Sequence, residues 1–240
     1  MVYIKEISAN SEEHRIAELL RQEEWTSDPR NHCVPILNLF KDPQDPELFY
    51  LVMPLLRPMN DPPFEQVKEI MEFTDQILEV KVFHLQPNLQ TQAHDSQGLI
   101  FLHEKGIAHR YETLYPDFVE FLSMCTHRDC VRPNIMMNGD AMYPEGFHPI
   151  RIKRTPDCLR TAEHTSRTVA GVKYYYLDFG ISCYLPDADS LRLVTGSDGR
   201  DQDPPELSDT NPYDPFKLDI FIIGNMLNQE FCRVGVFRRH

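Results

Sequence analysis

The sequence predicts an α+β fold in which a small, β-rich amino-terminal part precedes a mainly helical carboxy-terminal part. Alternating or apolar runs typical of short strands lie before residue 54, at 2–5, 34–40 and 48–53, and one more is expected at 172–178. Longer segments with helical periodicity follow, at 64–79, at 98–109 and from 211 onward. With 240 residues, 41% of them apolar, the chain can bury a core as one large domain or two small ones.

Net charge limits the general partners of the chain. Its formal charge of −13 argues against a nucleic-acid groove or an anionic membrane. One segment is locally basic, and for it a solvated loop is the simpler interpretation and a docking site the second; its cations are Arg151, Lys153, Arg154, Arg160 and Arg167. No apolar run has membrane-spanning length and no signal-peptide layout is present, which predicts a cytoplasmic or nuclear location.

The six cysteines show no CxxC pair and no framework spacing, so reduced thiols are expected. Cys125, His127 and Cys130 lie close together and would suit a zinc ion. A structural zinc site would need a second pair of ligands at a matching distance. The other cysteines are isolated, so zinc is the less favoured interpretation.

The first strand and the first helix bring a lysine and a glutamate into reach of each other. The strand at 2–5 ends in Lys5, and Ser11 is the expected amino-terminal cap of a helix over 11–20. With the apolar residues of this helix facing inward, Glu13 lies on the same side and can reach Lys5, and Glu18 is the second candidate. An ordinary surface lysine and a solvated acidic helix face are the alternative.

One short motif carries the main functional signal. The stretch 126–137 contains His-Arg-Asp, then Asn five residues after the Asp, then an apolar triplet. This spacing is typical of a protein-kinase catalytic loop, although a polar surface turn before a strand gives a similar string. Leu177-Asp178-Phe179-Gly180, Pro205-Glu206 and the apolar run from Asp219 follow in the kinase order. The chain therefore resembles the protein-kinase superfamily, and residues 127–225 are similar to a group of fungal protein-kinase-like proteins.

The resemblance implies a bilobal kinase-like fold. A small, incomplete β-rich amino lobe would cover 1–53, a hinge 54–58 and a mainly helical carboxy lobe 59–240, with the chain ending after a helix at 216–228. Insertions are expected near 80–97 and 111–128, since removing either restores a continuous kinase-like sequence. Translated introns or evolved functional loops would each explain them.

The resemblance also implies ATP and Mg²⁺ as cofactors, a protein substrate and a set of site residues. Lys5, paired with Glu13, would hold phosphates; Met53 would be the gatekeeper; and Pro54 and Leu56 would meet adenine through their backbone. Asp129 would be the catalytic base, preceded by Arg128, and Asn134 and Asp178 would bind Mg²⁺. Asp219 would hold the catalytic-loop backbone.

Two dipeptides compete for the place before the catalytic aspartate. His109-Arg110 and His127-Arg128 are identical in sequence. His127-Arg128 is the preferred pair because it is covalently next to Asp129, and closing the extra loop costs little entropy.

Departures from the family pattern predict weak or absent ATP turnover. No glycine-rich hairpin precedes Lys5, Tyr3 stands where the family has a small residue, and Val131 stands where serine/threonine kinases have a lysine. The resemblance thus leaves two functions open. The chain is either a serine/threonine-type kinase or a pseudokinase or fragment that acts by binding partners.

Overall fold

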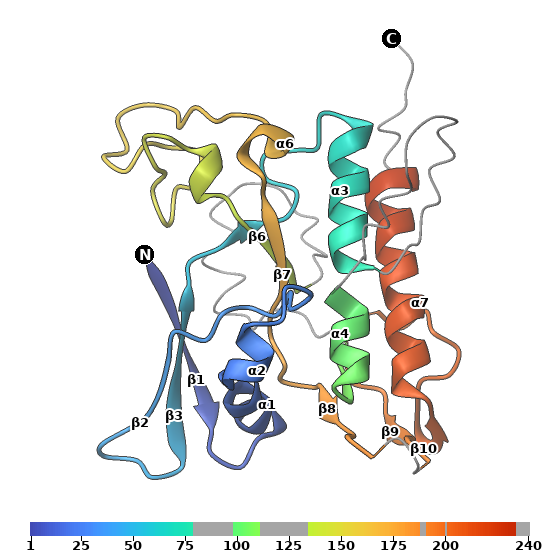
Figure 1. Ribbon diagram of the computed structural model, residues 1–240. Helices are drawn as coiled ribbons and strands as arrows, with labels where there is room; N and C mark the ends of the chain where they lie inside the picture. Colours follow the sequence, from blue (N-terminus) through green and yellow to red (C-terminus); the bar gives the residue numbers. More distant parts are fainter. Residues whose placement is uncertain (79–97, 111–133, 188–190, 200, 234–240) are drawn as a thin grey trace.

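The structure, a computed structural model, describes residues 1–78, 98–110, 134–187, 191–199 and 201–233 (Figure 1). Across these ranges the chain has the predicted α+β fold, with helices beside small antiparallel sheets. None of the helices in these ranges is both long and apolar enough to cross a membrane.

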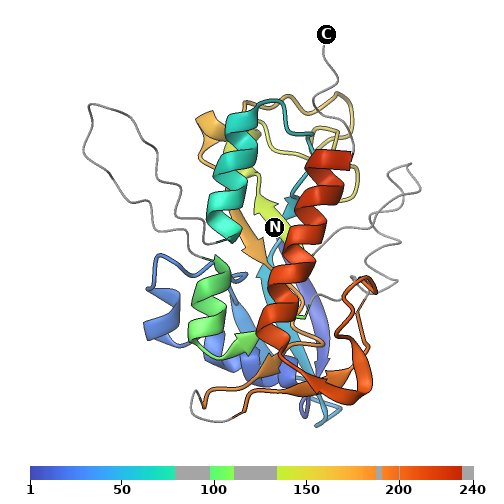
Figure 2. The same cartoon turned by 90° about the vertical axis from the view of Figure 1, so that its right-hand side faces the viewer.

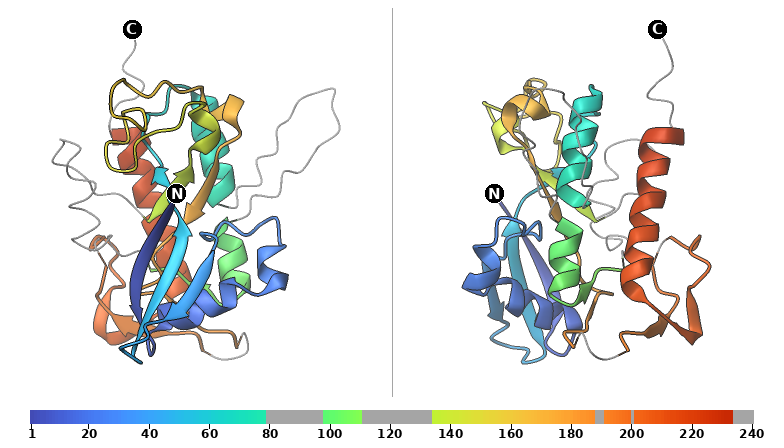
Figure 3. Two further views of the ribbon diagram at one scale, coloured as in Figure 1. Left: turned by 90° about the vertical axis from the view of Figure 1, so that its left-hand side faces the viewer. Right: turned by 45° about the vertical axis from the view of Figure 1, so that its right-hand side comes forward.

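The first sheet holds the amino-terminal part together. It contains β1 (Val2–Ser8), β3 (Leu48–Pro54) and β2 (Asn38–Lys41) in the order β1-β3-β2 (Figure 3, left). Alternation along β1 turns Ile7 toward Leu51 of β3 and Ala17 of α1 (Glu12–Leu20), and these three side chains share one buried apolar cluster. Helix α2 (Glu23–Thr26) follows directly.

A second three-stranded sheet lies at the centre of the molecule. It contains β4 (Arg57–Pro58), β6 (Ile135–Asn138) and β7 (Lys173–Tyr176) in the order β4-β6-β7. Residues 55–56 lead from β3 of the first sheet to β4 of the second. A parallel bridge between Cys33 and Tyr176 joins the connector after α2 to β7.

Three helices cover the second sheet and carry much of the core. They are α3 (Val67–Ile77), α4 (Gly98–Glu104) and α7 (Pro215–Leu227); α3 and α4 lie end to end beside α7 (Figures 1 and 2). Phe73, Phe101 and Ile223, one from each helix, are fully buried in one cluster. Short elements complete the described fold: β5 (Ile107–Ala108) paired with β8 (Cys183–Tyr184), β9 (Val194–Gly196) paired with β10 (Ser208–Tyr213), a 3₁₀ turn (Asp140–Met142), α6 (Arg167–Ala170) and a final π-helical segment (Asn228–Arg233).

Several predicted boundaries were wrong for identifiable reasons. The strand expected at 34–40 is present only as β2, because Pro35 has no N–H for a ladder and the N–H of Val34 donates to the carbonyl of Tyr176 instead. The apolar run expected from 211 becomes helical only at Pro215, where Asp214 caps it by accepting from the N–H groups of Phe216 and Lys217, close to the helix expected at 216–228. The helix expected at 98–109 ends at Glu104 and gives way to β5.

Candidate functional site

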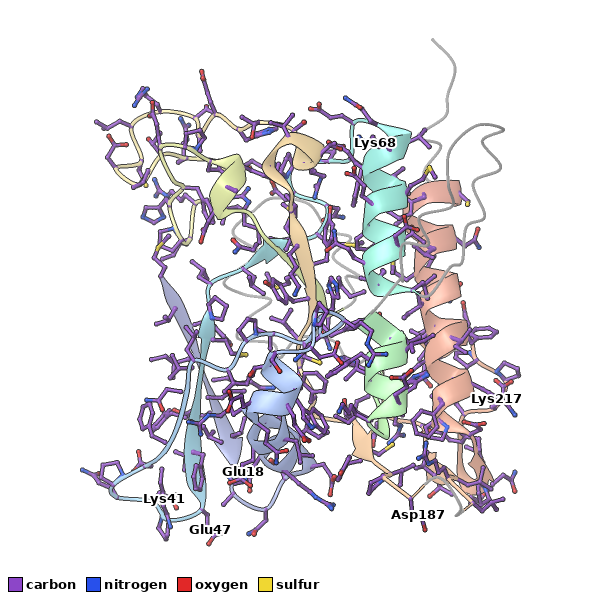
Figure 4. The ribbon with its side chains drawn as sticks, in the orientation of Figure 1. Glu18, Lys41, Glu47, Lys68, Asp187 and Lys217 are labelled. Carbon is purple, nitrogen blue, oxygen red and sulfur yellow. The ribbon has the colours of Figure 1, made fainter. Side chains whose placement is uncertain are left out.

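Lys5, Glu13 and Asp178 meet in one buried ion cluster. The ammonium of Lys5 donates to both carboxylate oxygens of Glu13, at 2.7 and 2.8 Å, and to Oδ1 of Asp178 at 2.7 Å. The three side chains are only 10, 6 and 4% exposed, so water screens these charges weakly. The predicted pairing of Lys5 with Glu13 is therefore present, whereas Glu18, the second candidate, is exposed on α1 (Figure 4).

The cluster contains two carboxylates and one ammonium. Burial lowers the pKa of Lys5, but the carboxylates of Glu13 and Asp178 outweigh burial and raise that pKa above its ordinary value. Burial, together with the nearby charge of Asp178, raises the pKa of Glu13 despite the opposing effect of Lys5. The site thus holds a fixed cation and an excess of negative charge.

Asp178 sits at a strained point of the backbone. Asp178 is the second residue after β7, and its φ is 59°, in the left-handed region that residues with a Cβ seldom adopt. The N–H of Gly180 donates to Oδ1 of Asp178 at 3.3 Å, and the N–H of Phe179 donates to the Glu13 carboxylate. Such strain persists only where surrounding contacts hold it, and it is concentrated at functional sites.

Asn134 lies beside Asp178, although the two are 44 positions apart in the chain. The backbone carbonyl of Asn134 accepts from the N–H of Leu177 at 2.8 Å, next to the pairing of Ile135 with Tyr176 between β6 and β7. The two predicted Mg²⁺ ligands therefore come from the ends of paired strands.

The donor chemistry of this pair suits magnesium. Carboxylate and amide oxygens are the hard ligands that Mg²⁺ prefers, and this ion usually keeps several waters or phosphate oxygens instead of a full protein cage. Among the described residues no group of three or more His, Cys, Asp or Glu side chains is arranged to hold a metal ion. Asp178 and Asn134 would thus hold Mg²⁺ together with phosphate oxygens.

Asp219, at the buried amino-terminal half of α7, fixes the chain that leads into the site. Its Oδ1 accepts from the N–H of Arg110 at 2.6 Å, and its Oδ2 accepts from the N–H of His109 at 2.7 Å. The carboxylate holds loop backbone as predicted, but the pair it holds is His109-Arg110. α4 and β5 deliver residues 109 and 110 to Asp219, whereas the preferred pair, His127-Arg128, lies outside the described residues.

Some of the predicted residues lie outside the described part of the chain. These are Arg128, Asp129 and Val131, together with the whole of both predicted insertions, 80–97 and 111–128.

His109 packs against the residues on either side of Asp178. Its Nε2–H donates to the carbonyl of Leu177 at 2.9 Å, and its ring lies 4.9 Å from that of Phe179, the residue after Asp178. Burial lowers the pKa of His109 even though Asp219 opposes this effect. The imidazole is therefore neutral at physiological pH and packs beneath the strained turn.

An apolar layer lies next to the ion cluster. Met53, at the end of β3, and Leu56, in the connection between the sheets, are buried in one cluster with Met136 and Leu177. Tyr3 packs on the same cluster and pairs in register with Met53. Pro54 closes β3 opposite Val2. The residues expected around adenine are thus close together, and the phenol of Tyr3 lies among them.

Sequence reasoning missed two contacts that complete the site. Nε2 of His103 is hydrogen-bonded to Asp219 at 3.0 Å, which adds a third group to that carboxylate. Arg110 donates to the hydroxyl of Tyr213 at 2.8 Å, and this hydroxyl donates to the carbonyl of Gly196 at 2.6 Å. Both depend on how α4, α7 and β9 approach one another, and no local spacing in the sequence indicates them.

Comparison of the chain with protein-family models and with curated proteins found no match, so its functional interpretation rests on its residues and their geometry.

Proposed function

We propose that this chain is a protein-kinase-like protein that binds ATP and Mg²⁺ and slowly transfers a phosphoryl group to serine or threonine of a protein substrate. The observation that carries the proposal is the contact of Lys5 with both Glu13 and Asp178. These residues come from a strand, a helix and a strand end far apart in sequence, and the resemblance to kinases assigns one function to all three.

Each residue has a defined part in the proposed reaction. Lys5 binds phosphate oxygens, and Glu13 orients its ammonium. Asp178 and Asn134 hold Mg²⁺, which when bound supplies positive charge to the phosphates. Asp129, five residues before Asn134 in sequence, accepts the proton of the substrate hydroxyl.

The architecture supports a bilobal arrangement with the site between its parts. The β1-β3-β2 sheet and α1 supply Lys5 and Glu13, whereas Asn134 precedes β6, Asp178 follows β7 and Asp219 lies in α7. Residues 54–58 connect the two groups, at the place proposed for the hinge. Slow turnover follows from the proposal for two reasons. The phenol of Tyr3 reduces the space for adenine beside the apolar layer, and Val131 offers no cation to the transferring phosphate.

A second function, binding without catalysis, is favoured by one specific observation. The Lys5 ammonium donates to three carboxylate oxygens, at 2.7 to 2.8 Å. A phosphate must compete with these oxygens, so the closed cluster favours a pseudokinase.

Phosphoryl transfer from radiolabelled ATP to a mixture of serine and threonine peptides separates the two functions. The kinase proposal predicts slow, Mg²⁺-dependent labelling that Asp129→Asn and Asp178→Asn abolish and that Glu18→Gln, an exposed carboxylate on α1, leaves unchanged. Labelling that persists in Asp129→Asn would contradict the role of Asp129 as the base. No labelling beyond that of boiled protein would reject the kinase in favour of the pseudokinase.

A further inference from the structure

The connection between β6 and α6 carries a basic turn that the proposed function does not use. Its tip is the four-residue stretch Arg151-Ile152-Lys153-Arg154, closed by a hydrogen bond from the N–H of Arg154 to the carbonyl of Arg151 at 2.7 Å. This loop is the yellow segment at the upper left of Figure 1. We call Arg151, Lys153 and Arg154 the basic turn.

A buried arginine, Arg57, anchors the backbone of the basic turn. Ile152 is 5% exposed, and its carbonyl accepts from the guanidinium of Arg57 at 2.7 Å. Arg57 is itself fully buried and packs against the rings of Tyr143 and Phe147, at 4.3 and 4.4 Å from their centroids. A further bond, from the N–H of His148 to the carbonyl of Arg154, ties the ends of the loop. The backbone is thus held in one conformation.

The three cations on this anchored backbone are exposed and uncompensated. Within the described ranges none of them forms an ion pair with a carboxylate, whereas Arg160 of the same loop pairs with Glu145 at 2.7 Å. Residues 148–156 contain no acidic residue, although the whole chain has a net charge of −13. Like charges held together without counter-ions repel one another, and a rigid backbone prevents their separation.

We propose that the basic turn is a docking surface for a short, carboxylate-rich segment of a partner protein. A long polyanion, such as duplex DNA or an anionic membrane, would also meet the acidic surface of the remaining chain. A segment of a few residues touches only the turn, because at physiological ionic strength charges beyond about 8 Å are largely screened.

Aspartate and glutamate fit the turn better than a single phosphate does. A phosphate site typically has backbone N–H groups that converge on one anion. Here the N–H groups of Ile150 and Arg151 donate to Nδ1 of His148, and that of Arg154 donates within the turn. Three separate side-chain cations match several single charges along a peptide.

The test is fluorescence anisotropy with the full chain and a labelled peptide of alternating Asp and Glu, compared with the same peptide in Asn and Gln. In the variant Arg151→Ser/Lys153→Ser/Arg154→Ser we expect affinity for the acidic peptide to fall about tenfold or more, because three ion pairs are lost. The matched control is Lys41→Ser/Lys68→Ser/Lys217→Ser, which removes the same charge from three exposed lysines elsewhere on the molecule (Figure 4). It should lose less than about threefold.

Three outcomes would overturn the proposal. Equal losses in the two triple variants would mean that only net charge matters. Equal binding of the acidic and amide peptides would exclude a charge-reading surface. Tighter turn-dependent binding of duplex DNA, or of vesicles containing phosphatidylserine, would assign the turn to a polyanion. Thermal unfolding of both variants at the wild-type temperature verifies that they fold, and none of these readouts depends on ATP or phosphoryl transfer.

Discussion

Replacing Lys5 by methionine tests the energetics of the candidate site. Methionine keeps much of the length and apolar volume of the side chain but removes the ammonium that Glu13 and Asp178 share. Both carboxylates remain buried, at 6 and 4% exposed, without the cation that neutralises them. The substitution therefore leaves two like charges close together in a poorly solvated place.

The expected cost follows from the geometry. Oε1 of Glu13 and Oδ1 of Asp178 each lie 2.7 Å from the same nitrogen, so these oxygens are separated by no more than twice that distance. At about 5 Å and an effective dielectric constant near 20, two unit charges repel by about 3 kcal/mol. Breaking a buried ion pair typically costs about 3–5 kcal/mol. We expect Lys5→Met to lower the free energy of unfolding by about 3–5 kcal/mol at pH 8.

The cost should shrink in acid, and the sign can be worked out. Without Lys5 the pKa of Glu13, already raised, rises further, so the folded state binds a proton more readily than the unfolded state. Stability lost by the variant is then recovered as pH falls through that raised pKa toward the ordinary value near 4.5. The deficit relative to wild type should be smaller at pH 5 than at pH 8.

Urea unfolding of four proteins measures this: wild type, Lys5→Met, Lys5→Met/Glu13→Gln and the exposed control Lys41→Met. The double variant should regain part of the loss, because only one buried carboxylate remains, and Lys41→Met should change stability by less than about 0.5 kcal/mol. A cost below about 1 kcal/mol for Lys5→Met, with no rescue by Glu13→Gln, would refute the reasoning.

Three further predictions concern groups away from the site. Burial lowers the pKa of His32 to about 4, so neutral His32 stabilises the fold above pH 6.5. The free energy of unfolding in urea should fall by about 3 kcal/mol as pH drops from 6.5 to below 4. The same pH dependence in His32→Asn would contradict this assignment. Burial raises the pKa of the Cys33 thiol, so mass spectrometry should find exposed Cys232 alkylated at pH 8 while Cys33 reacts only after unfolding; equal rates would exclude it. Arg57→Met should cost about 3–5 kcal/mol in urea unfolding, because Asp61 and the carbonyl of Ile152 lose their donor, and a loss under 1 kcal/mol would show that the anchor is unimportant.

Helix periodicity and capping account for what the sequence predicted well. Ser11 caps α1 by accepting from the N–H of His14, and this start sets the helix phase that turns Glu13 toward Lys5. Alternation along β1 places Lys5 on the same face as Ile7. A pair contact between neighbouring elements could therefore be predicted from local patterns.

Contacts between distant segments could not be predicted in the same way. His109-Arg110 and His127-Arg128 have the same two-residue sequence. The approach of β5 to α7 is what brings the N–H groups of His109 and Arg110 to the Asp219 carboxylate. The burial of Arg57 against two rings likewise depends on a loop that begins about 80 residues later in the chain. Side-chain chemistry is visible in a sequence, but the partner that satisfies a buried charge is set by tertiary packing.

Isothermal titration of ATP into the full chain, with and without Mg²⁺, tests the proposed function most directly. If Asp178 and Asn134 hold Mg²⁺ beside the phosphates, wild type should bind ATP at least about tenfold more tightly with Mg²⁺ than without it, a difference of about 1.4 kcal/mol. Asp178→Asn should remove that difference, and Glu18→Gln should keep it. ATP binding that is equal with and without Mg²⁺, or a Mg²⁺ effect that survives in Asp178→Asn, would contradict the assignment of this site to nucleotide and metal.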